Sequence, residues 1–117
     1  MRIALAQINP TVGALEANHD QIVAMAREAR ERGAELVIFP EMAICGYPAL
    51  DLLEKPEFVA ESQQWLRKAS RAVPEIAILC GCATPAPADS GKRVHNSALV
   101  VENGEVTGAV NNFRFNE

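Results

Sequence analysis

Two short apolar runs separated by an amphipathic stretch constrain the fold of this chain more than any other feature. Residues Ile3 to Ile8 and Leu36 to Phe39 are almost wholly apolar, which is typical of strands covered on both faces. Between them, from about Asn18 to Gly33, apolar residues recur with a helical period. We therefore predict a strand, helix, strand unit with parallel strands, in which Asn18 caps the helix and Gly33 ends it.

The rest of the chain continues this α/β pattern. A second helix is predicted from Pro56 to Pro74, and a third strand over Ile76 to Cys82. Two further strands, Asn96 to Glu102 and Glu105 to Val110, flank Asn103-Gly104, a dipeptide that favours a tight hairpin turn. The predicted order is β-α-β-α-β-hairpin in a single unit, whose two helices are too few to cover both faces of the sheet.

Composition and charge exclude several classes of protein. Hydrophobic residues make up 49% of the 117 residues and charged residues 22%, which indicates a packed core rather than disorder. The net charge of −4 offers no broad basic surface, so neither nucleic acid nor an anionic membrane is an expected partner. The apolar amino-terminal run is too short for a membrane span or a signal peptide, so we expect a cytoplasmic protein.

The cysteines and histidines give no sign of a metal site. Three cysteines are an odd number, which favours reduced thiols over a disulfide framework. Cys80 and Cys82 fall within a predicted strand, where small buried residues are common. Neither His19 nor His95 has a second ligand at metal spacing, so no metal is predicted.

Glu41 is the strongest local candidate for chemistry. It directly follows the apolar run that ends at Phe39-Pro40, at the carboxyl edge of the predicted sheet, where α/β folds usually bind ligands. Partial desolvation at such a position suits a carboxylate for general-base catalysis. From the residues alone, an ordinary solvated loop glutamate remains an alternative.

Several segments together resemble the nitrilase, or carbon-nitrogen hydrolase, superfamily. They are IALAQINPTVG at 3–13, Asn18, and GAELVIFPE at 33–41. The segment GYPALDLL at 46–53 is similar to the amino-terminal glutaminase domain of glutamine-dependent NAD(+) synthetases, and VHNSA at 94–98 matches at the family's spacing. Residues 1–117 are therefore identified as the amino-terminal portion of a single glutaminase domain.

This resemblance implies part of an α-β-β-α sandwich and a Glu, Lys and Cys triad that hydrolyses the side-chain amide of glutamine. Glu41 matches the general base. Tyr47 matches a tyrosine of the glutamine pocket, with packing of the loop as the alternative. In the family, a separate synthetase domain uses the ammonia with ATP and Mg to convert deamido-NAD to NAD, so no cofactor is expected in this portion. Glutamine and further copies of the intact protein, as a homo-oligomer, are the implied partners.

The other two members of the triad do not transfer to this sequence. The family lysine follows the hairpin, where an ungapped reading places Asn112 and a gapped reading of 112–117 deletes the position. Arg114 is a poor substitute, because a guanidinium hardly gives up its proton. The family cysteine corresponds to a position beyond residue 117, and Cys45 matches no catalytic position. We therefore expect the chain alone to be inactive; the alternative is a non-catalytic half-domain that assembles with itself or with a partner chain.

Overall fold

The computed structural model describes residues 1–46, 52–85 and 94–110. Within these ranges the strands form a five-stranded sheet in the order β1-β2-β3-β4-β5. The strands are β1 (Ile3–Leu5), β2 (Leu36–Ile38), β3 (Ala77–Pro85), β4 (Val94–Glu102) and β5 (Glu105–Val110). The first three strands run parallel, and β4 and β5 add an antiparallel hairpin to β3, as the sequence predicts.

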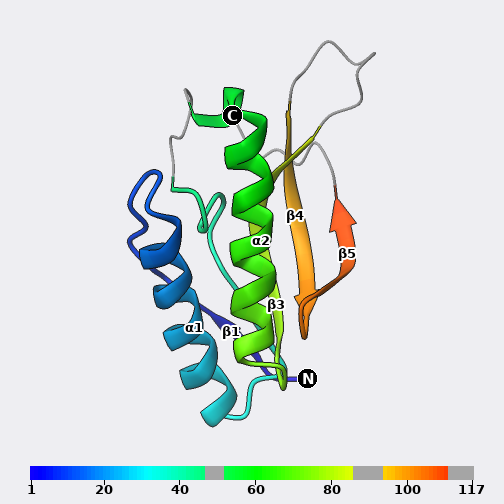
Figure 1. Cartoon of the computed structure of the whole chain (residues 1–117). Helices are drawn as coiled ribbons and strands as arrows, with labels where there is room; N and C mark the ends of the chain where they lie inside the picture. Colours follow the sequence, from blue (N-terminus) through cyan, green and yellow to red (C-terminus); the bar gives the residue numbers. More distant parts are fainter. Residues whose placement is uncertain (47–51, 86–93, 111–117) are drawn as a thin grey trace, which may run out of the picture.

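Two helices, α1 (Leu15–Glu31) and α2 (Pro56–Ala72), pack side by side on one face of the sheet (Figure 1). A short 3-10 helix, η1 (Leu52–Glu54), precedes α2. The core lies between the helices and the sheet, and its large, fully buried side chains include Ile22, Leu66, Val37, Ile78 and Val101. None of the described helices combines the length and the apolar composition that a membrane span requires.

The start of α1 corrects one sequence prediction. The helix begins at Leu15 with Ala14 at its N-cap, so Asn18 lies inside the first turn and is not the cap. Gly33 follows the helix with a positive φ of 85°, which confirms that the helix ends there.

Asn18 instead connects two loops. Its side chain is fully buried; the Oδ1 atom accepts a hydrogen bond from the Thr11 N–H at 2.8 Å. The Nδ2 atom donates to the carbonyl oxygens of Thr11, at 2.8 Å, and Ile44, at 2.9 Å. A backbone hydrogen bond of 3.0 Å from Gly13 N to Cys45 O joins the same two loops. Asn18 therefore fixes the loop that follows β2 against the loop that precedes α1.

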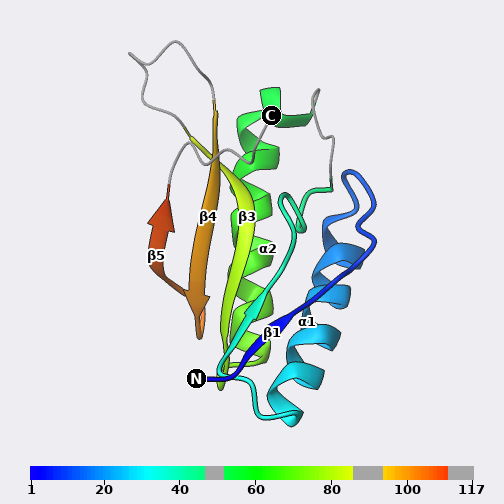
Figure 2. The same cartoon turned by 180° about the vertical axis from the view of Figure 1, so that it is seen from behind.

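The first strand is not the buried strand predicted for Ile3 to Ile8. It spans only Ile3–Leu5, and the side chains of Ile3 and Leu5 are 50% and 79% exposed. The physical reason is its place at the edge of a sheet whose second face, here called the open face, is covered by no helix among the described residues (Figure 2). The apolar residues of this strand are therefore not all buried, because the helices cover only one of its two faces.

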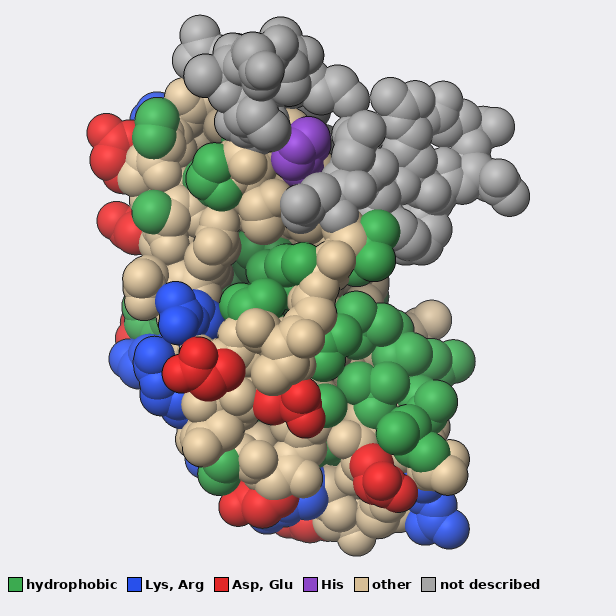
Figure 3. Space-filling view, turned by 90° about the vertical axis from the view of Figure 1, so that its right-hand side faces the viewer, with side chains coloured by type: hydrophobic (Ala, Val, Ile, Leu, Met, Phe, Trp, Pro, Cys, Tyr) green, Lys and Arg blue, Asp and Glu red, His purple; other side chains and the backbone are tan. Residues whose placement is uncertain are grey.

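The strand register places a row of apolar side chains across the open face. Leu5 pairs with Ile38, Ile38 with Leu79, and Leu79 with Val100. Side chains of directly paired residues lie on the same face of a sheet. Seen from the side, hydrophobic side chains gather on the side of the molecule away from the helices (Figure 3). The expectation that two helices leave one sheet face uncovered is confirmed for the described residues.

The hairpin has the predicted tight turn and is tied to α2. Asn103 and Gly104 both have positive φ angles, 48° and 83°, which such a turn requires. Arg67 Nε donates to the carbonyl oxygen of Gly104 at 2.9 Å, and the Gly104 N–H donates to Ser70 Oγ. These contacts hold β4 and β5 in a fixed position relative to the helix layer.

The hydrogen bonds of Asn18 predict a stability effect. We expect Asn18→Ala to lower the free energy of unfolding by about 1–3 kcal/mol, because it removes the partner of the buried Ile44 carbonyl oxygen and of the part-buried Thr11 backbone groups. Gln21→Ala is the matched control on the same helix, since Gln21 also bonds a backbone, that of Asn9, but at an exposed position where water can replace it. Denaturant unfolding of both variants measures the difference. Equal losses in the two variants would contradict a structural role for burial at Asn18.

Candidate functional site

Glu41 lies where the sequence predicts it, at the carboxyl end of β2. The residue before the intervening proline, Phe39, is buried, and its N–H continues the pairing to β3 by donating to Leu79 O at 2.8 Å. Glu41 then opens a turn over residues 41–45, and its side chain is half-buried. The Glu41 carboxylate thus lies at the carboxyl edge of the sheet and is only partly exposed to solvent.

The backbone of Glu41 lies directly against β3 at Gly81. A Cβ atom on Gly81 would lie 2.8 Å from Glu41 Cα and 2.9 Å from the backbone nitrogen of Met42. Real Cβ atoms essentially never approach other atoms so closely, so the turn can occupy this position only because residue 81 has no side chain. A second glycine, Gly46, closes the turn with a positive φ of 81° and a 2.8 Å hydrogen bond to Met42 O.

The carboxylate of Glu41 has a defined partner on β4. The side-chain amide Nδ2 of Asn96 donates a hydrogen bond to Glu41 Oε1. No lysine or arginine within the described ranges forms an ion pair with Glu41. From sequence, Asn96 is visible only as part of the VHNSA segment, without a role of its own, because its contact with Glu41 depends on the pairing of β3 with β4.

The three cysteines do not join this site as nucleophiles. Cys45, Cys80 and Cys82 are all free and fully buried. Burial raises the pKa of the Cys45 thiol to about 11 and that of Cys80 to about 12, and it also raises the pKa of Cys82 well above its ordinary value. At neutral pH all three are therefore neutral thiols, which are poor nucleophiles.

Other sequence-predicted positions lie apart from Glu41 or outside the description. Tyr47, Asn112 and Arg114 fall outside the described residues. The ring of His19 packs edge-on against Trp65, with 5.1 Å between ring centroids, and its Nδ1 lies 2.9 Å from Asp20 Oδ1. Among the described side chains, no group of three or more His, Cys, Asp or Glu could hold a metal ion.

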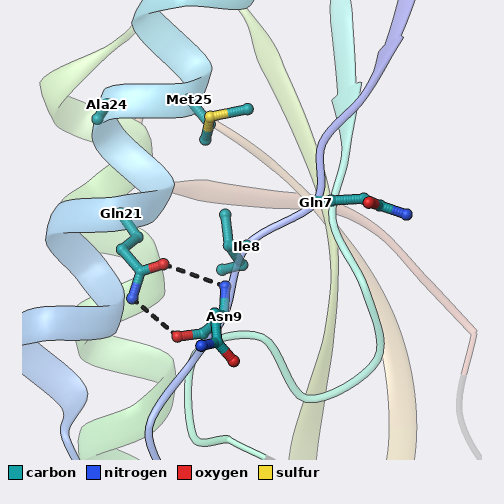
Figure 4. A pocket seen from close by; sticks show the side chains of 6 residues that line it. All are labelled: Gln7, Ile8, Asn9, Gln21, Ala24 and Met25. Carbon is teal, nitrogen blue, oxygen red and sulfur yellow. Dashed lines mark hydrogen bonds between the residues drawn. The ribbon is translucent and has the colours of Figure 1, made fainter.

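An open pocket of about 460 Å³ lies between α1 and the segment that follows β1. It is lined by Gln7, Ile8, Asn9, Gln21, Ala24 and Met25 (Figure 4). The amide of Gln21 is already occupied, because it accepts a hydrogen bond from Asn9 N and donates one to Asn9 O. With no ionisable or nucleophilic side chain in its lining, this pocket offers no groups for acid-base or covalent chemistry.

The contact at Gly81 predicts that alanine substitutions at two glycines of the sheet, Gly81 and Gly108, differ in their effect on stability. We expect Gly81→Ala to lower the free energy of unfolding by about 1–3 kcal/mol, because the added methyl group meets backbone atoms that cannot move aside freely. Gly108→Ala is the matched control on β5, where the nearest atom is a Val100 side-chain carbon at 3.5 Å, an ordinary contact. Denaturant unfolding distinguishes them, and a neutral Gly81→Ala would show that the turn does not depend on this approach.

Comparison with known sequences finds one family model and relatives that share one description. A family model described as carbon-nitrogen hydrolase matches residues 2–114. The chain is 47% identical over 110 residues to the glutamine-dependent NAD(+) synthetase of Synechocystis sp., covering 89% of this chain and 19% of that protein. It is 34% identical to the glutamine-dependent NAD(+) synthetase of Thermotoga maritima, covering 92% of this chain and 18% of that protein.

Solved structures agree with the sequence relatives. The glutamine-dependent NAD+ synthetase from Acinetobacter baumannii, in complex with ADP, superimposes with a TM-score of 0.80 and 32% identity, covering 93% of this chain and 20% of that one. An amidase from Nesterenkonia sp. gives a TM-score of 0.80 and 27% identity, covering 95% of this chain and 42% of that one. The chain spans about a fifth of the length of the synthetases it matches. Together with the motifs at 3–13 and 33–41, these matches show that the chain belongs to the carbon-nitrogen hydrolase family.

Proposed function

We propose that the complete protein containing this chain hydrolyses the side-chain amide of glutamine, with Glu41 as the general base. The observation that carries the proposal is a half-buried carboxylate, anchored through its backbone at Gly81 and through its side chain at Asn96. A carboxylate at the carboxyl edge of a sheet, held in one orientation, is suited to general-base catalysis. The chain's curated relatives, which are glutamine-dependent NAD(+) synthetases, supply the substrate class.

The proposed chemistry needs a nucleophile that this chain does not offer. In the mechanism implied by the resemblance, Glu41 takes the proton of a cysteine thiol, whose sulfur attacks the amide carbonyl carbon of glutamine. Glu41 then passes the proton to the departing nitrogen, which leaves as ammonia, and water hydrolyses the thioester to give glutamate and the free thiol. A lysine stabilises the oxyanion. A variant of the similar Nesterenkonia amidase carries the acetamide moiety of fluoroacetamide covalently at its active site cysteine, which supports a cysteine as the nucleophile.

We infer that the chain on its own is inactive, because Cys45, Cys80 and Cys82 are buried neutral thiols. In the complete protein, the released ammonia would serve the ATP-dependent conversion of deamido-NAD to NAD, in a synthetase domain that this chain does not include. Tyr47 is proposed to line the glutamine pocket. We expect the complete protein to be a cytoplasmic homo-oligomer.

Substitution of Glu41 tests the role of the general base. In the complete protein, Glu41→Gln should lower glutamine-dependent ammonia release by roughly 10²- to 10⁴-fold, since the amide cannot accept the thiol proton. Synthesis of NAD from added ammonia should be unchanged, because it bypasses the glutaminase step. Glu35→Gln is the matched control, since Glu35 is an exposed glutamate just before β2. Full glutamine hydrolysis by Glu41→Gln would overturn the assignment.

A second function, assembly without catalysis, is favoured by the open face. The row of Leu5, Ile38, Leu79 and Val100 presents apolar side chains on a sheet face that no described helix covers. Apolar surface of this kind promotes association. We expect the isolated 117-residue chain to sediment as a self-associated species and to release no ammonia from glutamine. A well-behaved monomer would contradict assembly, and glutamine turnover that Glu41→Gln abolishes would contradict the inactivity of the chain.

A further inference from the structure

We propose that Asn96 is a positioning residue for Glu41, and that its amide reserves one carboxylate oxygen so that the other exchanges protons. This inference rests on the proposed function, because it concerns how the general base is held. The Nδ2 atom of Asn96 donates to Oε1 of Glu41, so the proposed proton exchange takes place at the other oxygen, Oε2. A carboxylate with one fixed oxygen has one direction in which to take a proton.

The sheet register explains why Asn96 can do this. Asn96 on β4 pairs with Ala83 on β3, and the neighbouring pair on the same face is Ala98 with Gly81. Gly81 is the residue against which the Glu41 backbone lies. The backbone and the carboxylate of Glu41 are therefore anchored at diagonal positions on one face of two adjacent strands.

The support beneath Asn96 is rigid. The pairing of β3 with β4 runs without a shift from Ile78 and Val101 to Pro85 and Val94. The register shift in this hairpin lies elsewhere, between Val100 and Val101 in the pairing of β4 with β5. Asn96 thus lies on a regularly paired stretch of β4, where positioning residues are held more precisely than on loops.

The chemistry of the amide suits this role. An amide orients a carboxylate through an N–H donor without adding a charge, so it stabilises the anion less, and weakens it less as a base, than a lysine or arginine would. Asn96 cannot turn its amide around, because its Oδ1 would then face the carboxylate oxygen and the two acceptors would repel each other. Among the described residues, Oδ1 of Asn96 is buried and has no hydrogen-bond partner. Within this part of the chain, the bond to Glu41 is therefore the interaction that fixes the side chain.

The test compares substitutions of Asn96 in the complete protein by steady-state glutamine hydrolysis. Asn96→Ala should lower kcat by roughly 10- to 100-fold and leave KM nearly unchanged, because the base loses its orientation but the substrate keeps its contacts. Asn96→Asp keeps the shape and replaces the donor by a carboxylate. Its kcat relative to the unsubstituted protein should rise as pH falls, because the introduced carboxyl becomes an O–H donor when it is protonated. For Asn96→Ala this ratio should not rise at low pH.

Ser97→Ala is the matched control, because Ser97 is the next residue of β4 and hydrogen-bonds Thr84 Oγ1 at 2.6 Å on the opposite, helix-covered face. It should leave kcat for glutamine within about 3-fold, and all variants should retain ammonia-dependent synthesis. If Glu41→Gln abolishes glutamine hydrolysis but Asn96→Ala does not lower kcat, the positioning role is wrong and the proposed function stands. If Asn96→Ala and Ser97→Ala reduce both activities equally, Asn96 is only structural. If the unsubstituted complete protein hydrolyses no glutamine, the proposed function is overturned and this inference falls with it.

Discussion

The approach of the Glu41 turn to β3 is the constraint on which the candidate site depends. The turn fits only because Gly81 has no side chain. Its position relative to β3 is well defined, because the contact is made by backbone atoms. The far end of the same loop is held by Asn18, whose buried amide binds the carbonyl oxygen of Ile44. The loop that carries the carboxylate is thus attached to the sheet at one end and to α1 at the other.

The elements of the fold follow closely from local sequence signals. The helical period of α1 and α2, the proline that starts α2, and the Asn103-Gly104 turn each act over a few residues, and each is confirmed. The N-cap prediction for Asn18 is wrong because a polar residue near the start of a helix is typical of an N-cap, but the same residue can instead be buried within the first turn and hydrogen-bond distant loops. Its partner Ile44 is 26 positions away, so no local signal distinguishes the two.

The errors and omissions elsewhere share this cause. An apolar run such as Ile3 to Ile8 does not reveal whether its second face is covered, because that depends on which strand lies at the edge of the sheet. Asn96 could be assigned to a strand, but its contact with Glu41 depends on the exact register between β3 and β4. The place of Glu41 was predictable because it follows directly from the end of β2, whereas the catalytic role of Glu41 and the part played by Tyr47 stay predictions.

The candidate site and the open face lie on the same side of the sheet. Gly81 follows Leu79 on β3 at a spacing of two residues, and on β4 the residues Asn96, Ala98 and Val100 follow one another at the same spacing. Residues at this spacing point to one face of a strand, so the contacts that hold Glu41 adjoin the apolar row. Under the catalytic proposal, the nucleophile would come from a segment that borders the open face, and under the assembly proposal, a partner that covers the apolar row would also border Glu41. The catalytic and the assembly proposals accordingly differ in what covers this surface, and they share the requirement that it be covered.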